Sequence, residues 1–141
     1  MNWLLLFIVA LVIIYIIAKS FRGSVKYSAV QNAFYAKYTY DQLSDIQKEQ
    51  VKEKTLQIMI RGGLLEEDFH AMSEMLRFSY YALAMNELNI PPALKNEEWH
   101  YVRNPYMALH NSEHQIQVVK SHLTRKHNVQ IEFEKRLPFQ V

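Results

Sequence analysis

Residues 3–18 read WLLLFIVALVIIYIIA, without a charged side chain, a glycine or a proline. Residues 1–2 before this run and residues 20–21 after it bring the segment to about the 20 residues that a transmembrane helix needs. Trp3 and Tyr15 stand near its two ends, where amphipathic rings favour the headgroup region of a bilayer. The sequence therefore predicts a single transmembrane helix at the N-terminus.

Two other interpretations of this run fit the residues less well. A buried core helix would need apolar partners around its whole circumference, which so small a domain does not supply. A cleavable signal peptide begins with a positive region and ends in small residues before the cleavage site. Here no side-chain charge precedes Trp3, and the run ends in Ile17-Ala18-Lys19. We therefore expect an uncleaved membrane anchor.

The charges next to the run predict its orientation. Lys19, Arg22 and Lys26 all follow it, whereas no charged side chain precedes it. Because positive flanks stay on the cytosolic side of a membrane, we expect the N-terminus outside and the C-terminal domain in the cytosol.

The whole chain has 141 residues, enough for one domain once an anchor is set aside. We divide it into an anchor with its basic flank (1–22), a helical bundle (23–127) and an extended tail (128–141). Sixteen basic and fourteen acidic residues leave a net charge of +2, which argues against a nucleic-acid-binding protein. The absence of cysteine excludes disulfides, thiolate metal ligands and cysteine nucleophiles.

The pattern after the anchor predicts an all-α fold. Following a hinge at Gly23-Ser24, we expect helices over residues 26–40, 41–61, 64–89, 95–102 and 105–126. Turn-forming residues predict several of their ends, namely Gly62-Gly63, Pro91-Pro92 and Asn104-Pro105. The helix over 64–89 has the clearest three-and-four spacing of apolar residues, which places Leu76 and Leu83 in the interior.

The tail changes to a period of two, typical of a strand. Val129, Ile131 and Phe133 alternate with polar residues. One interpretation is a contact element for a partner protein, formed by Ile131, Phe133, Leu137 and Phe139. The alternative is that Leu137 and Phe139 fold back on the bundle.

The stretch from 120 to 127 reads KSHLTRKH and is strongly basic. Lys120, Arg125 and Lys126 would attract anionic lipid headgroups or contact a partner. The alternative is a helix C-terminus whose cations interact favourably with the helix dipole.

Three patterns resemble metal-binding spacings. Glu67-x-x-His70 and Glu97-x-x-His100 match the pair that di-metal helical bundles use, and His110 to His114 reads H-x-x-E-H. At about 100° per residue, however, Glu67 and His70 lie opposite the apolar stripe of their helix. The same geometry turns His110 and His114 away from the interior, so we expect no metal and no other cofactor.

No pattern specific to an enzyme is present. The chain lacks a G-x-S-x-G elbow, and three glycines do not supply a phosphate-binding loop. We therefore expect a non-enzymatic, membrane-anchored helical accessory or scaffolding protein, whose partners are the lipid bilayer and another membrane or membrane-associated protein. The alternative is a membrane-bound metal-binding protein or metalloenzyme that uses Glu67, His70, Glu97, His100, His110 and His114.

Overall fold

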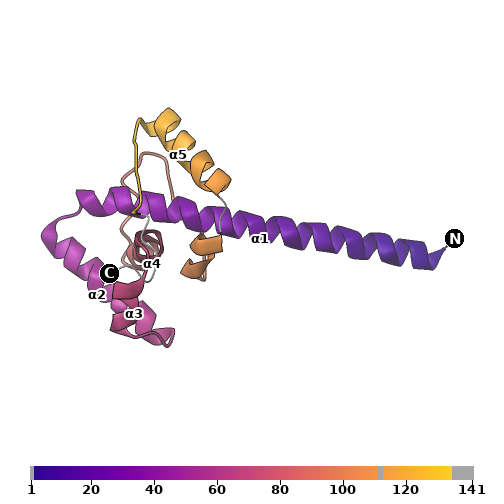
Figure 1. Cartoon of the computed structure of the whole chain (residues 1–141), viewed down its shortest axis with the longest axis horizontal. Coiled ribbons are helices and arrows are strands. Elements are labelled where there is room, and N and C mark those ends of the chain that lie inside the picture. Colours follow the sequence, from indigo (N-terminus) through magenta and orange to yellow (C-terminus); the bar gives the residue numbers. More distant parts are fainter. Residues whose placement is uncertain (1, 111–112, 135–141) are drawn as a thin grey trace.

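A computed structural model describes residues 2–110 and 113–134, and the side chains of residues 2–18, 27–109 and 113–134. Over these residues the elements are all helical, and the predicted all-α class is confirmed. They are α1 (Trp3–Gln42), α2 (Asp45–Arg61), α3 (Glu66–Ala71), α4 (Glu74–Glu87), the 3₁₀-helix η1 (Pro105–His110) and α5 (Glu113–His127). Figure 1 shows that the other helices gather around the C-terminal half of α1, whereas its N-terminal half projects away from them.

The first half of α1 corrects the prediction of a membrane anchor. The described side chains give it an apolar run of sixteen residues, 3–18, which spans about 24 Å, less than the ~30 Å of a bilayer's hydrocarbon core. Among the described residues no helix combines the length and the apolar character needed to cross a membrane. The predicted single-pass protein with a cytosolic C-terminal domain is therefore wrong. The side chains of Lys19, Arg22 and Lys26, expected to flank the anchor, lie outside the described ones.

The predicted hinge at Gly23-Ser24 is also absent, because α1 runs without a break from Trp3 to Gln42. A glycine inside a helix lowers stability by only about 1 kcal/mol relative to alanine. The burial of the helix after residue 28 outweighs a penalty of this size. The anchor segment and the helix expected at 26–40 are thus one element.

Local capping residues set both ends of α2. Ser44 accepts a hydrogen bond from the Gln47 backbone N–H (3.2 Å), and the Gln47 side chain accepts one from the Ser44 N–H (3.1 Å), which forms a capping box. Gly62 ends the helix as predicted, and Gly63 follows with a φ of +82°, a conformation that favours glycine. The helix begins later than the predicted residue 41 because Ser44 caps it.

The helix expected over residues 64–89 is divided into α3 and α4. Met72 and Ser73 are extended, and the Ser73 hydroxyl accepts a hydrogen bond from the Leu76 N–H (3.4 Å). A serine that caps a new helix competes with continuation of the old one. The apolar spacing that predicted a single helix continues across this break, which is why the spacing did not reveal it.

The helix predicted over residues 95–102 is wrong, because this segment has no regular structure. Side chains from α1 satisfy its backbone instead. The Asn32 side chain accepts from the His100 N–H (2.9 Å) and donates to the His100 carbonyl (2.8 Å). Just before this segment, the Thr39 hydroxyl accepts a hydrogen bond from the Ala93 N–H (2.9 Å). Such long-range bonds remove the need for a local helix.

The predicted start of the last helix at Asn104-Pro105 is confirmed, since the Asn104 side chain accepts a hydrogen bond from the Tyr106 N–H (3.1 Å). The expected single helix is two elements, η1 and α5, and residues 111–112 between them lie outside the described part. α5 ends at His127, followed by Asn128 in a left-handed conformation (φ 53°).

The described part of the tail, up to residue 134, is extended and forms no ladder with other described residues. Ile131 is buried, and Val129 and Phe133 pack on the same core cluster. The Phe133 ring meets the Phe34 ring of α1 edge-on, with centroids 4.6 Å apart. The alternating pattern thus places apolar side chains against the bundle itself. Leu137 and Phe139 lie outside the described residues.

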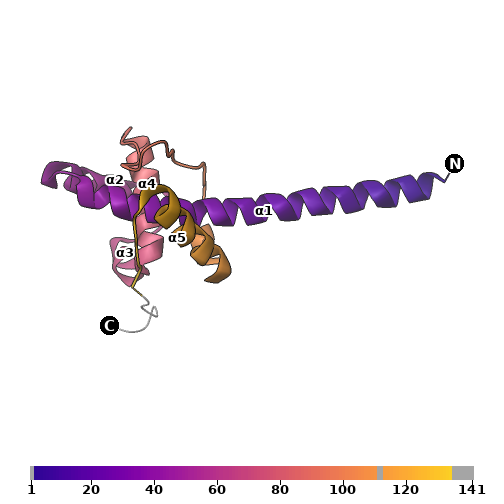
Figure 2. The ribbon, with the colours of Figure 1, turned by 90° about the horizontal axis from the view of Figure 1, so that it is seen from above.

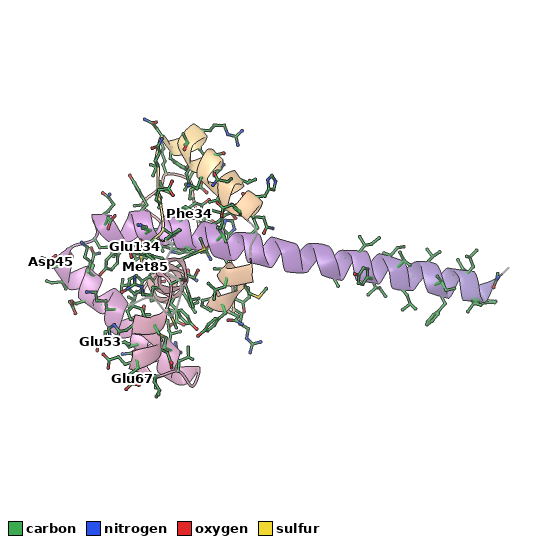
Figure 3. All side chains as sticks on the ribbon, viewed as in Figure 1. Phe34, Asp45, Glu53, Glu67, Met85 and Glu134 are labelled. Atoms are coloured by element: carbon green, nitrogen blue, oxygen red, sulfur yellow. The ribbon has the colours of Figure 1, made fainter. Side chains whose placement is uncertain are left out.

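The core surrounds α1 between Ala29 and Ala36. In Figure 2, α4 lies across α1, and the core clusters join α1 to α2, α4, η1, α5 and the tail. Figure 3 shows Phe34 and Met85 inside this arrangement, whereas Glu67 lies at its outer edge. The predicted interior position of Leu76 is confirmed, since it is 3% exposed, whereas Leu83 is half-buried.

These positions give a test of the core. Leu76→Ala leaves a cavity among Met59, Tyr80 and their neighbours, and we expect it to lower the free energy of unfolding by roughly 2–5 kcal/mol. His70→Ala removes an exposed side chain, so a change within about 0.5 kcal/mol is expected. Urea unfolding of the two variants measures both values. A larger loss for His70→Ala than for Leu76→Ala would contradict this orientation of the helices.

Candidate functional site

The densest group of interacting polar side chains surrounds Glu97, in the irregular segment between α4 and η1. Asn96 precedes it with a φ of 64°, and the Glu97 N–H donates to the Leu94 carbonyl (3.3 Å). The Trp99 indole donates to the Ile90 carbonyl (2.8 Å) and fixes the segment on the other side. The Glu97 side chain is 10% exposed.

Four side chains from α1 and α5 surround this carboxylate. The Tyr35 hydroxyl of α1 donates to Oε2 (3.0 Å). From α5, Lys126 Nζ lies 2.7 Å, His127 Nε2 2.9 Å and His122 Nε2 3.4 Å from the other oxygen, Oε1. We call Glu97 and these four partners the Glu97 cluster. It joins three separate parts of the chain.

The cluster favours the ionised carboxylate. Burial by itself raises the pKa of Glu97, but hydrogen bonds from Lys126, His127, Tyr35 and His122 outweigh it and lower the pKa to about 2. Burial and the nearby carboxylate raise the pKa of the Tyr35 hydroxyl well above its ordinary value, so Tyr35 stays a donor. Glu97 is therefore a partly buried negative charge compensated by α5.

The same atoms form a set of potential metal ligands. One oxygen of Glu97 and one ring nitrogen each of His122 and His127 lie within 4.8 Å of one another. Among the described residues, these three side chains form the one group of His, Asp and Glu residues whose ligand atoms are close enough to hold one ion.

The described residues of the alternative metal-binding set do not come together at one site. Glu67 and His70 lie together on α3, whereas His100 lies in the irregular segment and His114 in α5, and all four are exposed. His110 has a side chain outside the described ones. Of that predicted set, Glu97 alone enters the cluster, with histidines other than the predicted His100.

Sequence reasoning missed His122 and His127 as partners of Glu97. Both lie in the basic stretch 120–127, where they were considered only as part of a positive patch. They stand five residues apart, which is not a one-turn spacing on a helix, and His127 meets Glu97 because α5 ends there. The sequence signal that could have indicated these partners of Glu97 is a pair of histidines near the end of a predicted helix.

The predicted basic contact surface is partly used within the chain. Lys120 pairs with Glu132 of the tail, and Lys126 pairs with Glu97. Arg125 is exposed in the last turn of α5, where its charge favours the helix dipole. A role for these residues in binding lipid or protein stays a prediction.

A cavity of about 220 Å³ lies between α1, α4 and the segment after Trp99. Ligand pockets usually measure about 300–1,000 Å³. Two polar side chains that line it are already bonded within the chain, Asn32 to His100 and Ser79 to the Ala29 carbonyl. We therefore assign no ligand to this cavity.

Besides the Glu97 cluster, the N-terminal part of α1 is unusual because its apolar side chains are exposed. Fourteen large apolar residues between Trp3 and Ile17 are 45–79% exposed. We call residues 3–17 the apolar stem. Figure 3 shows its side chains pointing outward on all sides, without a neighbouring element.

The chain matches no protein-family model, no curated protein and no solved structure. Its function is therefore inferred from its own residues.

The lowered pKa gives a test of the Glu97 cluster. Because the pKa of about 2 in the folded state lies below the ordinary 4.5, ionised Glu97 stabilises the fold above pH 4.5 and loses this effect as the pH falls toward 2. We expect Glu97→Gln to be less stable than the unmodified chain near pH ~7. The difference should shrink as the pH falls below 4.5.

Urea unfolding at a series of pH values measures this difference. Glu67→Gln is the matched control, because Glu67 is exposed and lies outside the cluster. A difference for Glu97→Gln that stays constant from neutral to acidic pH would contradict a stabilising charge at this position.

Proposed function

We propose that the chain is a non-enzymatic accessory protein that joins a larger protein assembly by burying its apolar stem among apolar helices of a partner. The observation that carries this proposal is the exposure of fourteen large apolar side chains on the stem. Soluble monomers rarely expose a contiguous apolar patch larger than a few hundred Å². Patches of greater extent mark interaction surfaces.

The distribution of apolar residues on the stem favours a partner that encloses it. A helix that packs on one neighbour has an apolar stripe and a polar opposite face. The stem is apolar on every face and carries no charged residue. A helix of this kind is buried on all sides, as in the centre of a helical bundle.

The stem adds nothing to the core of the helical domain. Among the side chains that the structure describes, the buried residues of α1 begin at Ala29, and no residue of the stem belongs to a core cluster. The domain can therefore form its core without the stem, which leaves the stem available for a partner. The domain would then be held at the site where the stem is buried.

Photo-crosslinking in cells that produce the protein tests this proposal. A photoreactive residue at position 8 or at position 13 would lie on nearly opposite faces of the stem, about 140° apart. We expect both positions to crosslink to the same partner polypeptide. Position 46 is the control, because Ile46 is also a large exposed apolar residue (74%) but belongs to α2.

Three results would contradict the proposal: crosslinks to lipid alone, crosslinks to a second copy alone, or equal crosslinks from position 46. A double variant, Ile8→Lys with Ile13→Lys, should also lose the crosslink to the partner. In this variant the photoreactive residue is placed at a third position of the stem. The unfolding free energy of the domain should change by less than about 0.5 kcal/mol, since neither residue contacts the core. Ile46→Lys should leave the partner bound.

A further inference from the structure

We propose that Glu97, His122 and His127 bind a divalent transition-metal ion, of which Zn²⁺ fits the ligands best. The two ring nitrogens lie 3.4 and 2.9 Å from the same carboxylate oxygen. Ligand atoms about 2.0–2.1 Å from a tetrahedral Zn²⁺ are about 3.3 Å apart. The three ligand atoms lie within 4.8 Å of one another, so side-chain rotations can bring them to the spacing of a tetrahedral site. This inference does not depend on the proposed function of the stem.

The chemical types of the three ligand groups are those that Zn²⁺ prefers. Two neutral imidazoles and one carboxylate suit zinc, whereas Mg²⁺ and Ca²⁺ prefer oxygen ligands alone. Three protein ligands leave a fourth position for water. The ligands come from two segments, so a bound ion would connect the irregular segment around Glu97 to the end of α5.

The surroundings hold the ligands in place. The Tyr35 hydroxyl donates to Oε2 of Glu97 and orients the carboxylate while Oε1 faces the histidines. Hydrogen bonds of this kind from a neighbouring residue position metal ligands and affect affinity. Glu97 and His127 are 10% and 8% exposed, so the attraction to a cation is only weakly screened by water.

Lys126 competes with an ion for the same carboxylate oxygen. Its ammonium group lies 2.7 Å from the same Oε1 and compensates the carboxylate in the structure described. The side chain is 43% exposed on a flexible four-carbon chain, so it can move into solvent. Binding of Zn²⁺ to Glu97 and contact between Lys126 and Glu97 therefore compete with each other.

Isothermal titration of the full-length protein with Zn²⁺ alone tests the site. We expect one ion per chain and a rise in melting temperature when Zn²⁺ is present. His127→Gln and His122→Gln should each weaken binding by more than about tenfold. His70→Gln and His114→Gln are matched controls, since both histidines are exposed and distant from the cluster, and should leave the affinity unchanged.

The Lys126→Met variant separates this site from nonspecific binding to histidine. Because it removes the competing ammonium group, we expect Zn²⁺ affinity to rise several-fold. Circular dichroism checks that each variant is folded. Absence of Zn²⁺ binding, equal losses in the His70 and His114 controls, or an affinity unaffected by Lys126→Met would each overturn the proposal.

Discussion

The enclosure of α1 between Ala29 and Ala36 is the constraint on which the rest of the domain depends. Phe34 and Tyr35 are almost fully buried there, and burying a large apolar side chain contributes roughly 1.5–3 kcal/mol. Ala29, Ala33 and Ala36 let neighbouring elements approach the helix closely. α4, η1, α5 and the tail pack against this segment, whereas α2 packs mainly on α4 and α3 packs on α2. Most of the core therefore forms around one helix.

The two halves of α1 show why burial is not decided by apolar character alone. The stem is more apolar than the segment after residue 28, yet it is exposed because the remaining residues already pack around that later segment. Side chains of α1 also replace local structure elsewhere: Asn32 and Thr39 satisfy the backbone of the segment after α4. The C-terminal half of α1 therefore has two roles. It contributes side chains to the core, and it provides hydrogen bonds to a segment without regular structure.

Helix ends and buried faces that depend on residues close in sequence were predictable. Structure that depends on contacts with distant residues was not. Gly62, Asn104-Pro105 and the alternation in the tail are local signals, and each predicted a boundary or a buried face. The irregular segment at 95–102 depends on α1, more than 50 residues earlier, so its local pattern misleadingly indicated a helix. The break at Ser73 was missed for another reason, because a capping serine left the apolar spacing unchanged.

The Glu97 cluster was also only partly predictable, because distant residues complete it. The sequence identified Glu97 as a potential ligand but paired it with His100, because spacing along a helix was the only geometry available. Its histidine partners are 25 and 30 residues later, and they meet it because an irregular segment lies against the end of α5. The carboxylate also contacts α1 through Tyr35. A change at Glu97 therefore acts on how α5 and the irregular segment close over α1, while the stem, without core contacts, is left unaffected.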